Sequence, residues 1–207
     1  MSRKGILAVV SGFSGAGKGT LMKALLSGYA DQYALSISAT TRGPREGEVD
    51  GREYFFKTKE QFEQMIAEDA LIEHACYVGN YYGTPKSYVM EQLEAGKNVI
   101  LEIEIQGALA VKEKFPDTLL LFVTPPSAQE LERRLRGRGT ETDEVIKSRL
   151  KRAVEEAEFM DRYDYILVND ELETCVQEMH ELIQAQRHKT SQNQEFIVEM
   201  KEDLKQF

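Results

Sequence analysis

The residues from 12 to 20 have the types and spacing needed to bind phosphate. The segment reads Gly12-Phe13-Ser14-Gly15-Ala16-Gly17-Lys18-Gly19-Thr20. Its glycines let the backbone curl until several N–H groups face one anion, and Lys18 could reach the β- and γ-phosphates of a nucleoside triphosphate. Ser or Thr commonly follows the lysine directly, whereas here Gly19 comes before Thr20. The segment therefore predicts a phosphate loop in which the hydroxyl contact to Mg²⁺ is left open.

A phosphate loop needs a strand before it and a helix after it, and the flanking sequence predicts both. Gly5–Ser11 is a short apolar run rich in β-branched residues, which favours a buried strand. Lys18–Leu26 carries apolar residues at helical spacing, and Gly28 follows it, which favours a helix. The helix N-terminus would add partial positive charge beside the bound phosphates.

Strands and helices alternate along the rest of the chain. Asn98–Ile103 and Thr118–Val123 are apolar runs with the helical stretch Leu109–Phe115 between them, so they predict a βαβ unit and a parallel sheet. Other strands are expected at Ala34–Ser38, Leu71–Tyr77 and Tyr165–Val168. Helices are expected after the capping sequences Thr58-x-x-Gln61 and Ser127-x-x-Glu130, from Ser87 to Gly96, over Thr142–Asp161, and from Leu172 onward. The sequence predicts an α/β fold with a parallel sheet core.

The segment Thr40–Phe56 resembles the signature of bacterial guanylate kinases, which are nucleoside monophosphate kinases among the P-loop proteins. In that family two arginines and a tyrosine hold the phosphate of GMP, and here they correspond to Arg42, Arg45 and Tyr54. The chemistry agrees, because arginine offers a bidentate fork to a phosphate dianion and lysine does not. Taken alone, an Arg-x-x-Arg segment would be read as a charged surface loop.

The resemblance also implies residues that recognise guanine. Glu73 lies where the family places a carboxylate on the guanine edge, and that carboxylate can accept the neighbouring N1–H and N2–H₂ groups. Adenine offers no such pair of donors and would leave the carboxylate unpaired. Ser38 and Thr84 match positions that hydrogen-bond guanine, and Tyr82 matches a tyrosine that binds the GMP phosphate.

Two further carboxylates lie at alternate positions of an expected strand, which places Glu102 and Glu104 on one face. Many relatives have Asp at both positions. By resemblance we expect these side chains at the GMP site, with Mg²⁺ held by ATP near Thr20 and Glu102 rather than by the protein alone.

Arginines cluster toward the end of the chain, and eight of the twenty residues from Arg133 to Arg152 are Arg or Lys. By resemblance, the arginines of a mobile lid are Arg134, Arg138 and Arg149, whereas Arg133, Arg136 and Arg152 are expected to face solvent. Phosphoryl transfer needs donor and acceptor held in line and charge offset on the migrating group. The expected catalytic residues are Lys18, Arg42, Arg134, Arg138 and Arg149. Asn169 is expected to contact ATP.

The resemblance implies a P-loop NTPase-type three-layer fold with a GMP-binding insertion and a helical lid. The expected core comprises residues 1–37, 89–130 and 160–207, the insertion 38–88 and the lid 131–159. The implied activity is transfer of the γ-phosphoryl group of ATP to GMP, and to dGMP, within purine nucleotide metabolism and GMP recycling.

Composition limits the other possibilities. The 207 residues suffice for a full core, and a net charge of −9 argues against non-specific binding to nucleic acid or membranes. The two cysteines and three histidines show no metal-ligand spacing. We expect a cytoplasmic monomer or homodimer.

Two alternatives remain open at this point. One is a guanylate-kinase-like binding module that has lost catalysis, but such modules lose the loop lysine or the lid arginines, and this chain has Lys18, Arg134 and Arg149. The other is a kinase for a different acceptor, such as AMP, against which Glu73 and Ser38 argue.

Overall fold

A five-stranded parallel sheet forms the centre of the computed structural model, which describes residues 4–137, 139 and 142–207. Its strand order is β2-β7-β1-β8-β9, and every neighbouring pair is parallel. Buried apolar side chains fill the three inner strands, as expected for a sheet covered on both faces. The parallel sheet predicted from the βαβ unit is confirmed. The strands are β1 (Leu7–Gly12), β2 (Tyr33–Leu35), β7 (Asn98–Glu102), β8 (Leu119–Thr124) and β9 (Tyr165–Val168).

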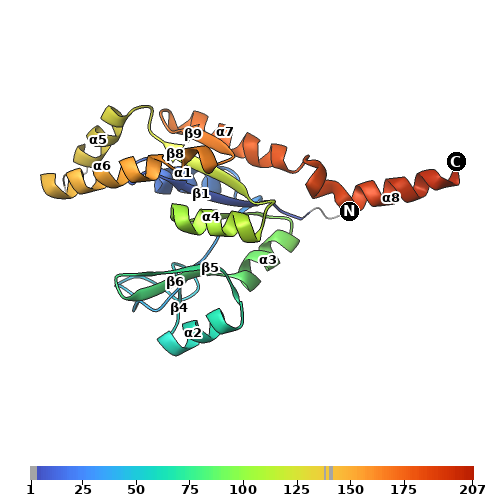
Figure 1. Cartoon of the computed structure of the whole chain (residues 1–207), viewed down its shortest axis with the longest axis horizontal. Helices are drawn as coiled ribbons and strands as arrows, with labels where there is room; N and C mark the ends of the chain where they lie inside the picture. The colour runs from blue at the N-terminus through green and yellow to red at the C-terminus, as the bar shows by residue number, and fades with distance from the viewer. Residues whose placement is uncertain (1–3, 138, 140–141) are drawn as a thin grey trace.

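Helices cover this sheet and connect it to a second one (Figure 1). α1 (Lys18–Gly28) packs on α7 (Leu172–Gln186), while α4 (Ile105–Lys114) contacts both β1 and the second sheet. α5 (Ala128–Gly137) and α6 (Asp143–Ala157) contact each other beyond the carboxyl end of β8. The result is the α/β three-layer architecture expected from the sequence.

The second sheet has four strands and is built entirely from residues 39–85. Its order is β4-β3-β6-β5, and α2 (Lys59–Ala67) packs on it through the fully buried Phe62. β5 and β6 form a hairpin whose turn, Val78-Gly79, has positive φ at both residues, as a tight two-residue turn requires. The strands are β3 (Ala39–Thr40), β4 (Phe55–Phe56), β5 (Leu71–Tyr77) and β6 (Asn80–Pro85).

The C-terminal helix α8 (Gln194–Asp203) projects away from the rest of the molecule (Figure 1). Short 3₁₀ turns lie at Met160–Arg162, Thr190–Asn193 and Leu204–Gln206. Within the described residues, no helix is both long enough and apolar enough to cross a bilayer.

Several local predictions need correction. Ser87 does not cap a helix, because α3 (Lys86–Glu94) begins one residue earlier, directly after β6, with Pro85 at its N-cap. α4 starts at Ile105 rather than Leu109. The capping box at Thr58 is confirmed in both directions, whereas only the Ser127 half of the second box forms. The Glu130 carboxylate turns instead to Arg133 and Arg134.

Candidate active site

The phosphate loop lies between β1 and α1, as its sequence context predicts. Gly15 and Gly17 have positive φ values of 100° and 89°, which explains why glycine occupies both positions. The Lys18 ammonium donates to the carbonyl oxygens of Gly12 at 2.7 Å and Phe13 at 3.2 Å. The lysine is therefore held across the loop, above the N-terminus of α1.

Asn169 forms a hydrogen bond with the backbone of this loop. It follows β9, is almost fully buried, and donates from Nδ2 to the carbonyl oxygen of Ala16 at 2.8 Å. Its amide is thus engaged with the loop backbone. Contact between Asn169 and ATP stays a prediction.

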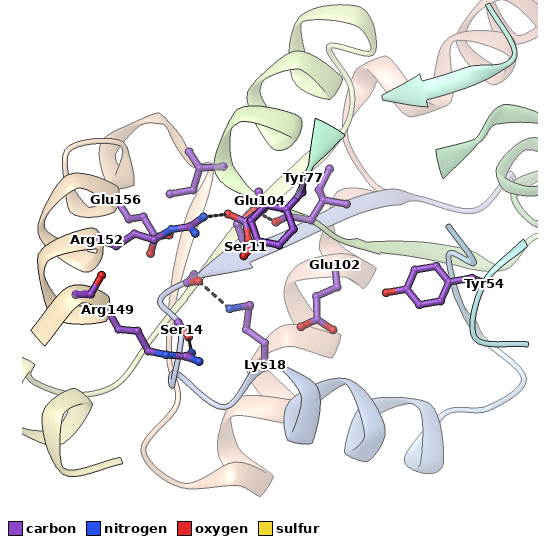
Figure 2. Close-up of a pocket in the computed structure, with 14 residues that line it drawn as sticks. Ser11, Ser14, Lys18, Tyr54, Tyr77, Glu102, Glu104, Arg149, Arg152 and Glu156 are labelled. Atoms are coloured by element: carbon purple, nitrogen blue, oxygen red, sulfur yellow. Dashed lines mark hydrogen bonds and ion pairs between the residues drawn. The ribbon is translucent and has the colours of Figure 1, made fainter. Parts of the chain in front are cut away.

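A cleft of about 750 Å³ opens beside the loop. Figure 2 shows Lys18 and Glu102 facing it from the core, Tyr54 and Tyr77 from the second sheet, and Arg149 from α6. A smaller pocket of about 360 Å³ lies at the mouth of the loop, between Thr20 and Glu102. The cleft joins the phosphate loop to the second sheet.

Hard oxygen donors flank the smaller pocket. Thr20 is exposed there and Glu102 lines both pockets, and hydroxyl and carboxylate oxygens suit Mg²⁺ that arrives with a nucleotide. No group of three or more His, Cys, Asp or Glu side chains in the described residues could hold a metal ion. One hydroxyl and one carboxylate supply fewer oxygens than the six that Mg²⁺ takes, so the Thr20 and Glu102 side chains fit a metal shared with phosphate oxygens.

Arg42 lies over the ring of Tyr54 and forms an ion pair with a carboxylate. Both of its terminal nitrogens donate to Glu48, at 2.9 and 3.0 Å, and its guanidinium carbon lies 5.2 Å from the Tyr54 ring centroid. The pair raises the pKa of Arg42 and lowers that of Glu48. Tyr82 meets Tyr54 edge to face at 6.2 Å. Three of the residues expected at the GMP phosphate therefore lie together.

Arg45 joins this cluster through its backbone. Its N–H donates to Glu48 at 2.7 Å, while the residue itself is exposed. Glu48 was not singled out from the sequence. Its position three residues after Arg45 in the same loop was the available signal.

Glu73 lies on β5 and Thr84 on β6, and Ser38 directly precedes β3. The Thr84 hydroxyl donates to Glu73 Oε1 at 2.7 Å. The register of β3 with β6, in which Ala39 pairs with Gly83, would place Ser38 opposite Thr84 if extended by one residue. Burial raises the pKa of the Glu73 carboxyl, and the Thr84 hydrogen bond partly offsets that rise. A half-buried carboxylate at a fixed orientation can accept two parallel N–H donors.

Of the expected lid arginines, Arg134 lies on α5 and Arg149 lies on α6. Arg149 Nη1 donates to the Ser14 hydroxyl at 2.5 Å and lines the cleft. Arg134 pairs at 2.6 Å with Glu130 on its own helix, and it is not among the residues that line either pocket. Arg138 lies outside the described residues.

Arg152 is exposed, as expected, and it also lines the cleft and contacts Glu104 there. One prediction about the cleft wall was wrong. Glu104 does not share a strand face with Glu102, because β7 ends at Glu102 and Glu104 is the N-cap residue of α4, with no side-chain capping bond. Both carboxylates nevertheless line the cleft. Arg133 and Arg136 are exposed and paired on the surface, as expected.

Comparison with known proteins decides the family. The family model described as guanylate kinase matches residues 4–186. The chain belongs to the guanylate kinase family. It is 47% identical over 203 residues to the guanylate kinase of Caldanaerobacter subterraneus subsp. tengcongensis, covering 98% of each chain. It is 52% identical over 189 residues to that of Bacillus subtilis, covering 91% of this chain and 93% of the relative.

A solved guanylate kinase also shares the fold. The crystal structure from Anaplasma phagocytophilum superposes with a TM-score of 0.69 at 30% identity, covering 91% of this chain and 89% of that one. The family model stops at Gln186, so α8 lies beyond it.

Other residues at the guanylate kinase cleft had not been singled out from the sequence. Ser11 lines the cleft and donates to the Ile103 carbonyl oxygen at 2.8 Å, which ties the end of β1 to the end of β7. Tyr77 reaches the cleft from the hairpin, and Ser148 and Glu156 reach it from α6. Only the relative placement of the two sheets and α6 brings these residues together, so no local signal pointed to them.

Proposed function

We propose that this protein transfers the γ-phosphoryl group of ATP to GMP, and to dGMP, giving ADP and GDP in purine nucleotide metabolism and GMP recycling. The single observation that carries the proposal is the Glu73–Thr84 hydrogen bond, which joins β5 and β6 of the sheet whose Tyr77 reaches the cleft beside the phosphate loop. Glu73 itself lines a separate pocket of about 320 Å³, bordered by Gly107. A loop alone would indicate only a nucleoside triphosphate. A half-buried carboxylate that can accept two parallel N–H donors would select guanine over adenine at the acceptor.

On the acceptor side, Glu73, Thr84 and Ser38 would bind the guanine edge. Arg42, Arg45, Tyr54 and Tyr82 would bind the monophosphate, with Glu48 holding Arg42 toward the tyrosine rings. The GMP dianion adds charge to the cleft, and arginine forks offset that charge while fixing the phosphate oxygens.

On the donor side, the loop from Gly12 to Thr20 would bind the ATP phosphates through backbone N–H groups. Lys18 would exchange its loop carbonyl contacts for phosphate oxygens. Mg²⁺ bound with ATP near Thr20 and Glu102 would neutralise charge on the β- and γ-phosphates.

Transfer needs no covalent enzyme intermediate. A phosphate oxygen of GMP attacks the γ-phosphorus in line, the bond to the β–γ bridging oxygen breaks, and ADP leaves. Arg149, already at Ser14, would stabilise the charge spread over the equatorial oxygens, together with Arg134 and Arg138 once the lid closes. The second sheet would act as the GMP-binding insertion and α5–α6 as the lid.

A coupled assay for ADP formation, run with MgATP and each of GMP, dGMP, AMP, CMP and UMP, tests this proposal. We expect turnover with GMP and dGMP and little with the others. Equal turnover of AMP would contradict guanine selection. GMP binding without ADP production would indicate a binding module in place of an enzyme.

A further inference from the structure

Arg152 reaches from α6 across the cleft and lies between two carboxylates. Its Nη2 contacts Glu104 at the start of α4, and its Nε donates to Glu156 on the next turn of α6 at 2.9 Å. Figure 2 shows the guanidinium between the two carboxylates, and Tyr77 of the second sheet lines the same cleft. Lid, core and second sheet therefore meet around one arginine.

The charges that line the cleft show what this arginine does. Among the residues that the structure describes, the cationic side chains lining the cleft are Lys18, Arg149 and Arg152, and the anionic ones are Glu102, Glu104 and Glu156. Within this described set, the positive and negative charges balance while Arg152 is present. Without it, the cleft that must admit two phosphate-bearing substrates would carry excess negative charge and repel them.

Arg152 lies on the acceptor side of this cleft. One turn earlier on α6, Arg149 contacts Ser14 of the phosphate loop, whereas Arg152 contacts Glu104, beyond the end of β7. α4, which follows Glu104, packs on β5, the strand that carries Glu73. Donor phosphates have the loop backbone to bind them. Of the four side chains proposed for the acceptor phosphate, only Tyr54 lines this cleft, so entry of the acceptor depends more on the charge of this wall.

Stability alone does not account for the arrangement. The side chains of Arg152 and Glu104 are 51% and 70% exposed, and ion pairs at such exposure contribute little to folding. A pair that spans a substrate cleft instead fixes where one carboxylate lies.

We propose that Arg152 is a positioning residue for the acceptor, which holds and neutralises Glu104 so that a nucleoside monophosphate dianion can enter the cleft. This inference rests on the proposed phosphorylation of GMP.

The test compares Arg152→Ala, Arg152→Lys, Glu104→Gln and the double variant Arg152→Ala/Glu104→Gln with the full-length wild type. Lys151→Ala serves as the matched control, since it removes the same charge from the neighbouring exposed position of α6. GMP affinity is measured by calorimetry without ATP, KM and kcat for both substrates by the coupled assay, and folding by thermal denaturation.

We expect Arg152→Ala to raise the Kd and KM for GMP about tenfold and the KM for ATP less than about twofold. Arg152→Lys should lie between wild type and Arg152→Ala, because lysine keeps the charge and loses the fork. In the Glu104→Gln background, where no carboxylate needs neutralising, Arg152→Ala should change GMP affinity less than about twofold.

Three results would overturn the inference. An equal loss in both backgrounds would mean that Arg152 contacts the substrate directly. A fall in kcat with an unchanged KM for GMP would assign it to the transfer step. A lower melting temperature with normal kinetics would leave it a structural role only. If wild type fails to phosphorylate GMP, the proposed function fails; if wild type succeeds and Arg152→Ala matches it, only this inference fails.

Discussion

The hydroxyl of Thr84 is completely buried and donates a 2.7 Å hydrogen bond to Oε1 of Glu73. The other carboxylate oxygen, Oε2, faces Gly107 on α4, where an added Cβ would lie 3.4 Å from it. The carboxylate is therefore fixed on one side by β6 and bordered on the other by a residue without a side chain. This orientation underlies the expected choice of guanine.

Replacing Glu73 with Gln should weaken GMP binding about ten- to a hundredfold, because the amide would point a donor at the donors of guanine. ATP affinity should stay within about twofold. Calorimetry with each nucleotide measures both, and Glu94→Gln, an exposed acid on α3, is the control. Unchanged GMP affinity in the Glu73 variant would remove this residue from the guanine site.

The pKa of Glu73 predicts a pH dependence. Burial raises this pKa above its ordinary value, so the carboxyl takes up a proton at a higher pH than an exposed glutamate does. Only the ionised form accepts both guanine donors. GMP affinity should therefore fall as pH decreases through the raised pKa, and the fall should begin above the usual glutamate range.

The ratio of wild-type to Glu73→Gln affinities isolates this effect, since the GMP phosphate titrates in both proteins. The sign is opposite for folding: ionisation of a half-buried carboxyl with a raised pKa costs stability, so its contribution to the free energy of unfolding declines as pH rises, while GMP affinity increases. A ratio that stays constant with pH would show that Glu73 does not titrate at the binding site.

Glu48 should act through Arg42. It accepts from both terminal nitrogens of that arginine and from the N–H of Arg45, so Glu48→Gln should raise the KM for GMP about three- to tenfold and leave kcat near wild type. The lowered pKa of Glu48 keeps this pair ionised through the assay range. The neighbouring exposed Glu46→Gln is the control. Tighter GMP binding in the variant would show instead that Glu48 competes with phosphate for the arginine.

The phosphate loop and most of the helices and parallel strands could be predicted from local sequence. The glycines at 15 and 17, the apolar strand before them and the helix after them are all determined by residues within a short window. The capping box at Thr58 is likewise local. Such features follow from backbone sterics and short-range hydrogen bonds.

Long-range contacts could not be predicted in the same way. The start of α3 at Lys86 follows from β6 running directly into the helix, which overrides the cap at Ser87. The Arg152–Glu104 contact joins residues 48 apart in sequence. Which face of α6 meets the cleft depends on how α5 and α6 pack on the core, and helical periodicity alone does not settle it.

Arg149 should matter more for kcat than for binding. Its contact with Ser14 places a guanidinium beside the phosphate loop, where charge on the migrating group develops. Arg149→Ala should lower kcat about a hundredfold, with a change of less than about fivefold in either KM. Arg133→Ala is the control, because that side chain is 74% exposed and pairs only with Glu130 among the contacts described. A large rise in KM at normal kcat would mean that Arg149 binds ground-state ATP instead.

A variant of Asn169 can show whether this residue supports the phosphate loop or contacts the adenine ring of ATP. Its Nδ2 donates to the buried Ala16 carbonyl, and a Cβ at Gly17 would lie 2.5 Å from the same nitrogen, so the side chain fits closely against the loop. Asn169→Ala should cost about 1–3 kcal/mol of stability by leaving that carbonyl without a partner. As a brace, Asn169 should affect ATP and GTP as phosphoryl donors by the same factor. Denaturant unfolding gives the first quantity and the coupled assay the second. A loss confined to ATP, at wild-type stability, would assign Asn169 to the adenine ring.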